Sequence, residues 1–263
     1  MKTFLSFVKQ ARWVLIALVA LFFAYMGYRW ISPPLPGVYK VAIDTTWYPM
    51  SFYGRESSIT AFSIDVLFSI ARREKIQLDL VYSGPKRIAE LLDDELVHGI
   101  LTGMKPDPIL EETYYFSEPY YRLGAVLVIR KEDDFTSLLN LPSKRVAVRR
   151  NSPILFKVQV DPKATIIPFD SPVGALEQLV RGEVDAVVID KLLTYLYYGG
   201  SYQDKLKVVT LPLTVDGLRL VTLQDSAGEA LIEAFNEGLK QIKEEGVYDE
   251  FLNQWDLYNP DKL

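Results

Sequence analysis

Seven residues that can bind a small polar molecule stand at or just after short apolar runs in the chain. They are Asp44, Trp47, Thr102, Gly103, Lys105, Ser152 and Asp190. The indole of Trp47 would offer a ligand an apolar face and a cation–π surface for an ammonium group. Gly103 has no side chain, so the backbone could approach a ligand closely at that point. The set indicates ligand binding rather than catalysis.

The same positions also suit ordinary structural roles. Trp47 can equally belong to a hydrophobic core, Ser152 can cap a helix, and Asp190 can cap a helix that starts at Lys191. A nucleophile triad requires a histidine, and the only histidine, His98, falls inside a predicted strand. The sequence contains no glycine-rich phosphate loop, HExxH motif or acidic metal loop. We therefore expect a binding protein and not an enzyme, with no cofactor and no bound metal.

The composition is that of a folded protein with little affinity for nucleic acid. The chain has 263 residues, 49% of them hydrophobic, which is enough for one or two sizeable cores. Residues 32–263 hold 25 basic and 34 acidic side chains, a formal charge of −9 that disfavours nucleic acid as a partner. Because the chain has no cysteine, it can form neither a disulfide, nor a thiolate metal site, nor an acylated cysteine.

The N-terminus contains a membrane-directed segment. Residues 13–28 are sixteen uncharged residues that follow Lys2, Lys9 and Arg12 and precede Arg29 and Trp30. They form either a cleaved signal peptide or an uncleaved anchor, and the basic and aromatic flanks without a small-residue cleavage site favour the anchor. Residues 1–31 are then a cytoplasmic tail and transmembrane segment, 32–38 a proline-rich linker, and the rest faces the periplasm.

Apolar runs from residue 39 onward alternate with segments of helical period, which predicts an α/β fold with parallel strands. One strand–helix–strand–helix–strand unit is expected over residues 41–101. The second has strands at 145–148, 165–169 and 184–189, with a helix at 172–181. Extended runs at 123–129 and 217–222 would connect the two units. We therefore expect lobe 1 at 39–130 and 216–263 and lobe 2 at 131–215, with a small ligand bound between them at the strand ends.

Two motifs connect this pattern with a known family. Residues 61–65 read AFSID and residues 116–121 read FSEPYY. They resemble the GFDxD and FSxPYY motifs of type 2 periplasmic solute-binding proteins of family 3, the amino-acid-binding branch, and the similarity extends from about residue 40 to 255. The resemblance implies a two-lobed Venus-flytrap fold and capture of a small polar ligand for an ABC-type permease in the inner membrane.

The resemblance also implies roles for individual residues. Asp190 matches the aspartate that pairs with the ligand's ammonium group, Thr102 a position that supplies a hydroxyl, and Ser152 a helix N-terminus that receives a carboxylate. Asp44 and Trp47 stand where the family has an acid or small residue and an aromatic that stacks on the ligand. The family's carboxylate-binding arginine is replaced by Leu110 in this chain. Lys105, Arg149 and Arg150 are the candidates to substitute for it.

Three functions are compatible with these observations. The first is a tethered or secreted binding protein for an amino-acid-like solute that an ABC importer takes up. The second is a ligand-sensing or accessory ectodomain that acts on a membrane partner. The third, more remote, is an enzyme similar to the cyclohexadienyl dehydratases, in which Asp44 or Asp190 would serve as a general acid.

Overall fold

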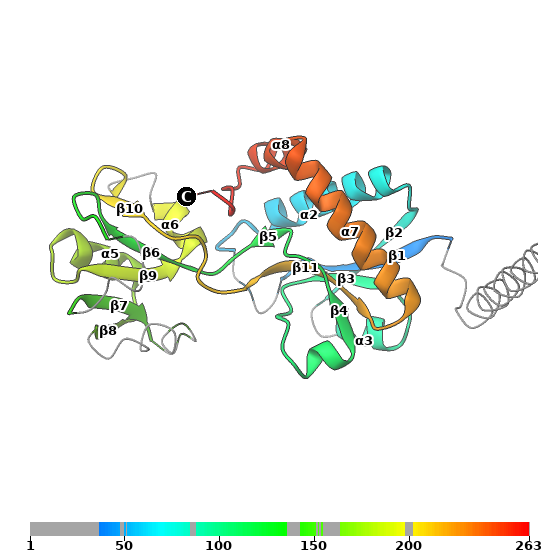
Figure 1. The fold of residues 1–263 in the computed structure, drawn as a ribbon, viewed down its shortest axis with the longest axis horizontal. Coiled ribbons are helices and arrows are strands. Elements are labelled where there is room, and N and C mark those ends of the chain that lie inside the picture. Colours follow the sequence, from blue (N-terminus) through cyan, green and yellow to red (C-terminus); the bar gives the residue numbers. More distant parts are fainter. Residues whose placement is uncertain are drawn as a thin grey trace, which may run out of the picture.

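Two mixed β-sheets, each covered by helices, form two lobes that are connected by extended segments (Figure 1). The computed structural model describes residues 37–47, 50, 52–84, 88–135, 143–150, 152, 154, 164–197 and 202–262. The predicted membrane segment at 13–28 and the linker residues 32–36 lie outside this range. Within the described ranges, we find no helix with the length and apolar character that crossing a bilayer requires.

The sheet of lobe 1 has the strand order β2-β1-β3-β11-β4, and β5 pairs with β11. The strands are β1 (Tyr39–Asp44), β2 (Leu78–Ser83), β3 (Gly99–Thr102), β4 (Tyr114–Phe116), β5 (Tyr121–Arg122) and β11 (Gly217–Leu223). β1 is parallel to β2 and β3, whereas β11 returns antiparallel to β3. The polar residues that follow β1 and β3 therefore lie at one edge of the sheet.

Helices cover both faces of this sheet. The larger core contains residues of α2 (Glu56–Glu74), α7 (Ser226–Glu244) and α8 (Val247–Gln254). The smaller core contains residues of α3 (Ile88–Asp93) and lies beside the 3₁₀ helix η1 (Leu110–Glu112). In α2 the buried residues recur at helical spacing, for example Ile59, Phe62, Val66 and Ile70, so burial of one face holds the helix on the sheet.

The two family-like motifs hold lobe 1 together. The Tyr120 hydroxyl donates to Ser63 Oγ at 2.9 Å, and the Tyr248 hydroxyl donates to the Tyr120 carbonyl at 2.7 Å. Asp65 accepts a hydrogen bond from Trp255 Nε1 at 2.7 Å. Both motifs thus fix α2 and α8 to the sheet, which makes their part in this lobe structural.

The sheet of lobe 2 has the strand order β10-β6-β9-β7-β8. Its strands are β6 (Ala125–Arg130), β7 (Arg145–Arg149), β8 (Thr165–Phe169), β9 (Ala186–Asp190) and β10 (Leu206–Val208), with α5 (Pro172–Val180) and α6 (Lys191–Tyr197) packed beside them. β7 is parallel to both β8 and β9. The predicted lobe boundary at residue 130 differs from this arrangement, because β6 pairs with β9 and so belongs to the second sheet.

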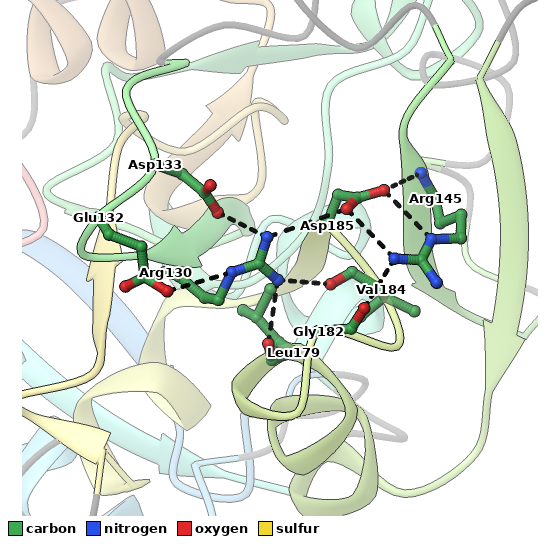
Figure 2. Close-up of polar contacts among 8 residues, drawn as sticks. All are labelled: Arg130, Glu132, Asp133, Arg145, Leu179, Gly182, Val184 and Asp185. Atoms are coloured by element: carbon green, nitrogen blue, oxygen red, sulfur yellow. Dashed lines mark hydrogen bonds and ion pairs between the residues drawn. The ribbon is translucent and has the colours of Figure 1, made fainter.

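A cluster of charges stabilises the end of lobe 2 where β7 and β9 begin (Figure 2). Arg130 lies 3.0 Å from Asp133 and donates to the Val184 carbonyl at 2.9 Å. Asp185 accepts from the Arg145 backbone N–H at 2.7 Å. Burial would raise the pKa of Asp185, but the hydrogen bonds from Arg145 outweigh it and lower that pKa. This charge cluster does not extend to the opposite end of the sheet, where β7, β8 and β9 finish at Arg149, Phe169 and Asp190.

Two crossing segments run side by side between the lobes. The Leu123 N–H donates to the Asp216 carbonyl at 2.9 Å, and the Leu213 N–H donates to the Ala125 carbonyl at 2.8 Å. Gly124 has φ +113°, and a Cβ at this position would lie 2.2 Å from Thr214 Oγ1. This crossing therefore requires a glycine.

Candidate functional site

The ends of three strands of lobe 2 surround a pocket of about 380 Å³ that also reaches lobe 1. Arg149 ends β7, Phe169 ends β8 and Asp190 ends β9. Lys105 enters from the loop after β3 of lobe 1. Ala125, Arg150, Ser152, Ile154, Pro172, Val188, Ile189, Leu193, Thr214 and Asp216 complete the lining. The volume is in the range of sites for small organic molecules, and parallel strand ends are the usual place for such sites.

Asp190 faces a cation within this pocket. Its carboxylate lies 3.9 Å from the Arg149 guanidinium, at the limit of an ion pair, and 44% of its side chain is exposed. Burial by the pocket walls raises the pKa of Asp190; Arg149 opposes this shift, and the Asp216 carboxylate adds to it. The ion pair of Asp190 with Arg149 is weak, and the Asp216 carboxylate adds a second negative charge. An ammonium group that binds here would therefore give both carboxylates a better counter-charge.

Lys105 connects lobe 1 to the crossing segment. Its ammonium group lies 3.0 Å from the Asp216 carboxylate, and 47% of its side chain is exposed. The pocket thus contains two pairs of opposite charge, Arg149 with Asp190 and Lys105 with Asp216. Groups of both signs are in place for a ligand that carries both charges.

Ser152 and several apolar residues form the rest of the wall. The Ser152 N–H donates to the Arg149 carbonyl at 3.1 Å, so the chain turns directly after β7. Phe169, Ile154 and Leu193 are apolar lining residues that sequence reasoning did not identify, and Asp216 is a charged one. Phe169 could have been predicted, because it is the last residue of β8 and the parallel strands β7, β8 and β9 all end at the same edge of the sheet.

Three of the predicted residues, all from lobe 1, lie outside the lining of this pocket. The buried carboxylate of Asp44 accepts from the backbone N–H and the hydroxyl of Thr46, each at 2.8 Å. Thr102 Oγ1 accepts from the Met104 N–H at 3.2 Å. A Cβ at Gly103 would lie 2.7 Å from Met50 Cγ. These contacts give each residue a local structural role at the edge of lobe 1.

Trp47 lies in the core of lobe 1, which corrects the expectation that it stacks on a ligand. Its side chain is 0% exposed, and its Nε1 donates to Thr60 Oγ1 at 3.0 Å. Its ring contacts Phe52 edge-on, with ring centroids 6.3 Å apart. Trp47 has φ +57°, a left-handed backbone conformation at the turn after β1. The side chain is thus buried in the core and is not available to the pocket.

Comparisons with known proteins agree with this architecture. Residues 39–257 match the family model described as bacterial extracellular solute-binding proteins, family 3. The ABC transporter arginine-binding protein 1 of Escherichia coli is 24% identical over 219 residues, which cover 81% of this chain and 88% of that protein. The virulence sensor protein BvgS of Bordetella pertussis is 24% identical over 93% of this chain but only 20% of the sensor.

A solved structure shows the same fold. The L-cystine solute receptor of Neisseria gonorrhoeae, in an unliganded open conformation, superposes with a TM-score of 0.66 at 18% identity, covering 86% of this chain and 96% of the receptor. The family model accounts for both lobes and for the helices that close lobe 1. The chain is a member of the bacterial extracellular solute-binding proteins, family 3.

Proposed function

We propose that this protein captures a small zwitterionic solute of the amino-acid type in the interlobe pocket. The observation that carries the proposal is the pairing of Asp190 with Arg149 inside a cavity of about 380 Å³ that Lys105 reaches from the other lobe. The solute's ammonium group would bind the Asp190 carboxylate, and its anionic group would bind a cation at the pocket wall. The similarity to an arginine-binding protein supports a ligand of this class.

Calorimetric titration of the full chain with the common L-amino acids and L-cystine tests the proposal. We expect at least one of them to bind, and Asp190→Asn to weaken that binding more than tenfold, because the ligand's buried ammonium group would lose its counter-charge. Asp204→Asn is the matched control, since the Asp204 side chain is fully exposed and outside the pocket. Equal affinity in the wild type and Asp190→Asn would exclude this pocket as the binding site.

We propose further that the bound solute is passed to an ABC-type permease. The similarity to an ABC transporter binding protein supports this role. Residues 13–28 would anchor the chain in the inner membrane with both lobes in the periplasm. Membrane fractionation of cells that express the full chain would then find it intact in the pellet. A soluble product that begins between residues 25 and 33 would instead indicate a cleaved signal peptide.

Ligand sensing is a second candidate function. It is favoured by the similarity to part of a virulence sensor protein, of which this chain matches 20%. In this case ligand binding would change the contact of the lobes with a membrane partner and would not lead to uptake. Uptake of a radiolabelled ligand by cells with and without the gene separates the two functions, because only a transport component lowers uptake when it is deleted.

A further inference from the structure

A second cavity, called here the C-terminal cavity, lies between lobe 2 and the segment that follows α8. Its volume is about 670 Å³, against about 380 Å³ for the interlobe pocket, and the two share no lining residue. Among its lining residues are Lys191 and Tyr195 of α6, Lys207 of β10, and Leu257, Tyr258 and Lys262 of the C-terminal segment. A molecule bound in this cavity would therefore contact both lobes.

The described lining of the C-terminal cavity carries positive charge only. It contains Lys191, Lys207 and Lys262 and no acidic residue. The interlobe pocket differs, because its lining combines lysine and arginine with two aspartates. No described carboxylate lies within 4.0 Å of the ammonium group of Lys207 or of Lys191. The lining therefore favours an anion over a zwitterion.

Two acids near the cavity already have cationic partners. Asp261 lies 2.7 Å from Lys243, and Asp249 lies 2.7 Å from Lys262. The second pair is exposed, so it contributes little stability, and Lys262 can turn toward another anion at little cost. Burial lowers the pKa of Lys191, and the charge of Asp261 opposes that shift. An anion in the cavity would add to the effect of Asp261 and provide the counter-charge that these lysines lack.

Aromatic and aliphatic side chains form the rest of the wall that the argument needs. The rings of Tyr195 and Tyr258 lie 5.5 Å apart between centroids, and Tyr195 is 40% exposed. Leu257 is a further apolar lining residue. Aromatic rings of this kind pack well against a flat apolar group. We propose that the C-terminal cavity is a second ligand site, which binds an aromatic carboxylate through the Lys207 ammonium group and the two tyrosine rings.

Calorimetric titration of the full chain with benzoate, phenylacetate and indole-3-acetate, each compared with its neutral amide, tests the proposal. We expect at least one of the acids to bind, and to bind at least about fivefold more tightly than its amide. Lys207→Met keeps the apolar stem but loses the charge, so it should reduce this preference to less than about twofold. Lys205→Met is the matched control, because Lys205 is exposed, stands two residues before Lys207 and does not line the cavity. Asp190→Asn should bind the acid as the wild type does, since Asp190 lines only the interlobe pocket.

Three results would overturn this proposal without affecting the proposed function. If none of the three acids binds, or if acid and amide bind equally, the cavity is not a site for aromatic anions. If Lys207→Met keeps the full preference for the acid, the acid binds elsewhere, and Lys207→Gln gives the same comparison if Lys207→Met does not fold. If Asp190→Asn weakens binding of the acid as much as Lys207→Met does, the acid occupies the interlobe pocket. A loss confined to Lys207→Met, with Lys205→Met and Asp190→Asn unchanged, supports the second site.

Discussion

At the scale of single residues, the interlobe pocket combines groups whose charges are incompletely paired. Asp190 and Arg149 are 3.9 Å apart, at the limit of an ion pair. A folded protein normally pairs such groups, so incomplete pairing at the edge of a cavity is typical of a site that a ligand completes. The pocket residues would thus gain favourable contacts when a zwitterion binds.

The raised pKa of Asp190 predicts a pH dependence of ligand affinity. Burial raises this pKa above its ordinary value, so the carboxylate becomes protonated at a less acidic pH than an exposed aspartate does. Affinity for an ammonium-bearing ligand should be full above this raised pKa and decrease as the pH falls through it. Calorimetry across pH 7 to 4 measures the effect. Asp190→Asn should bind weakly at every pH, and an acid-induced loss that persists in this variant would point to another group.

Residue types at strand ends were predictable from the sequence, but side-chain directions were not. Asp190 and Lys105, two of the predicted ligand-binding residues, lie in the lining of the pocket. Trp47 holds the equivalent position after β1, but it has φ +57° and is buried in the core. Asp216 was not identified, because it lies directly before β11 and does not follow a strand. Its place in the pocket follows from the pairing of the two crossing segments, a contact between residues 93 positions apart that no local pattern reveals.

At the scale of secondary structure, the regular strands and helices follow the sequence pattern closely. The predicted strand at 165–169 has the observed bounds of β8, and the predicted helix at 172–181 corresponds to α5. β6 differs because its apolar run was interpreted as a lobe connection. Its residues alternate between two cores, with Val126 and Val128 in one and Leu127 and Ile129 in the other. A strand covered on both faces is apolar throughout, so its sequence does not reveal which sheet it joins.

The crossing at Gly124 predicts a strong effect of a small substitution. Gly124→Ala would place a Cβ 2.2 Å from Thr214 Oγ1 in a backbone conformation, φ +113°, that L-residues rarely adopt. We expect the free energy of unfolding to fall by at least about 2 kcal/mol, which lowers the melting temperature by roughly 4–8 °C. Differential scanning calorimetry measures this shift. Gly84→Ala is the control, since a Cβ there meets no atom of the described residues within 4 Å, and similar stability of both variants would argue against a strained crossing.

At the scale of the whole molecule, the C-terminal segment connects the lobes in addition to the two crossings. It leaves α8 of lobe 1 and reaches α6 of lobe 2 (Figure 1). The buried Lys191 ammonium group donates to the carbonyls of Pro260, at 3.0 Å, and Lys262. The centroid of the Tyr258 ring lies 5.4 Å from that of the Tyr121 ring in lobe 1 and 5.5 Å from that of the Tyr195 ring in lobe 2. This segment therefore restrains the angle between the lobes.

Removal of the Lys191 ammonium group should loosen that restraint. Lys191→Met keeps the apolar stem but loses both hydrogen bonds to the C-terminal carbonyls, so the lobes should sample a wider range of angles. Because the chain has no cysteine, spin labels at Glu237→Cys and Asp204→Cys, one on each lobe, would report the interlobe distance without competing sites. We expect electron paramagnetic resonance to find a broader distance distribution in Lys191→Met and an unchanged one in the control Lys240→Met, whose side chain is exposed on α7. Equal widths in all three proteins would mean that the hydrogen bonds of Lys191 do not restrain the angle between the lobes.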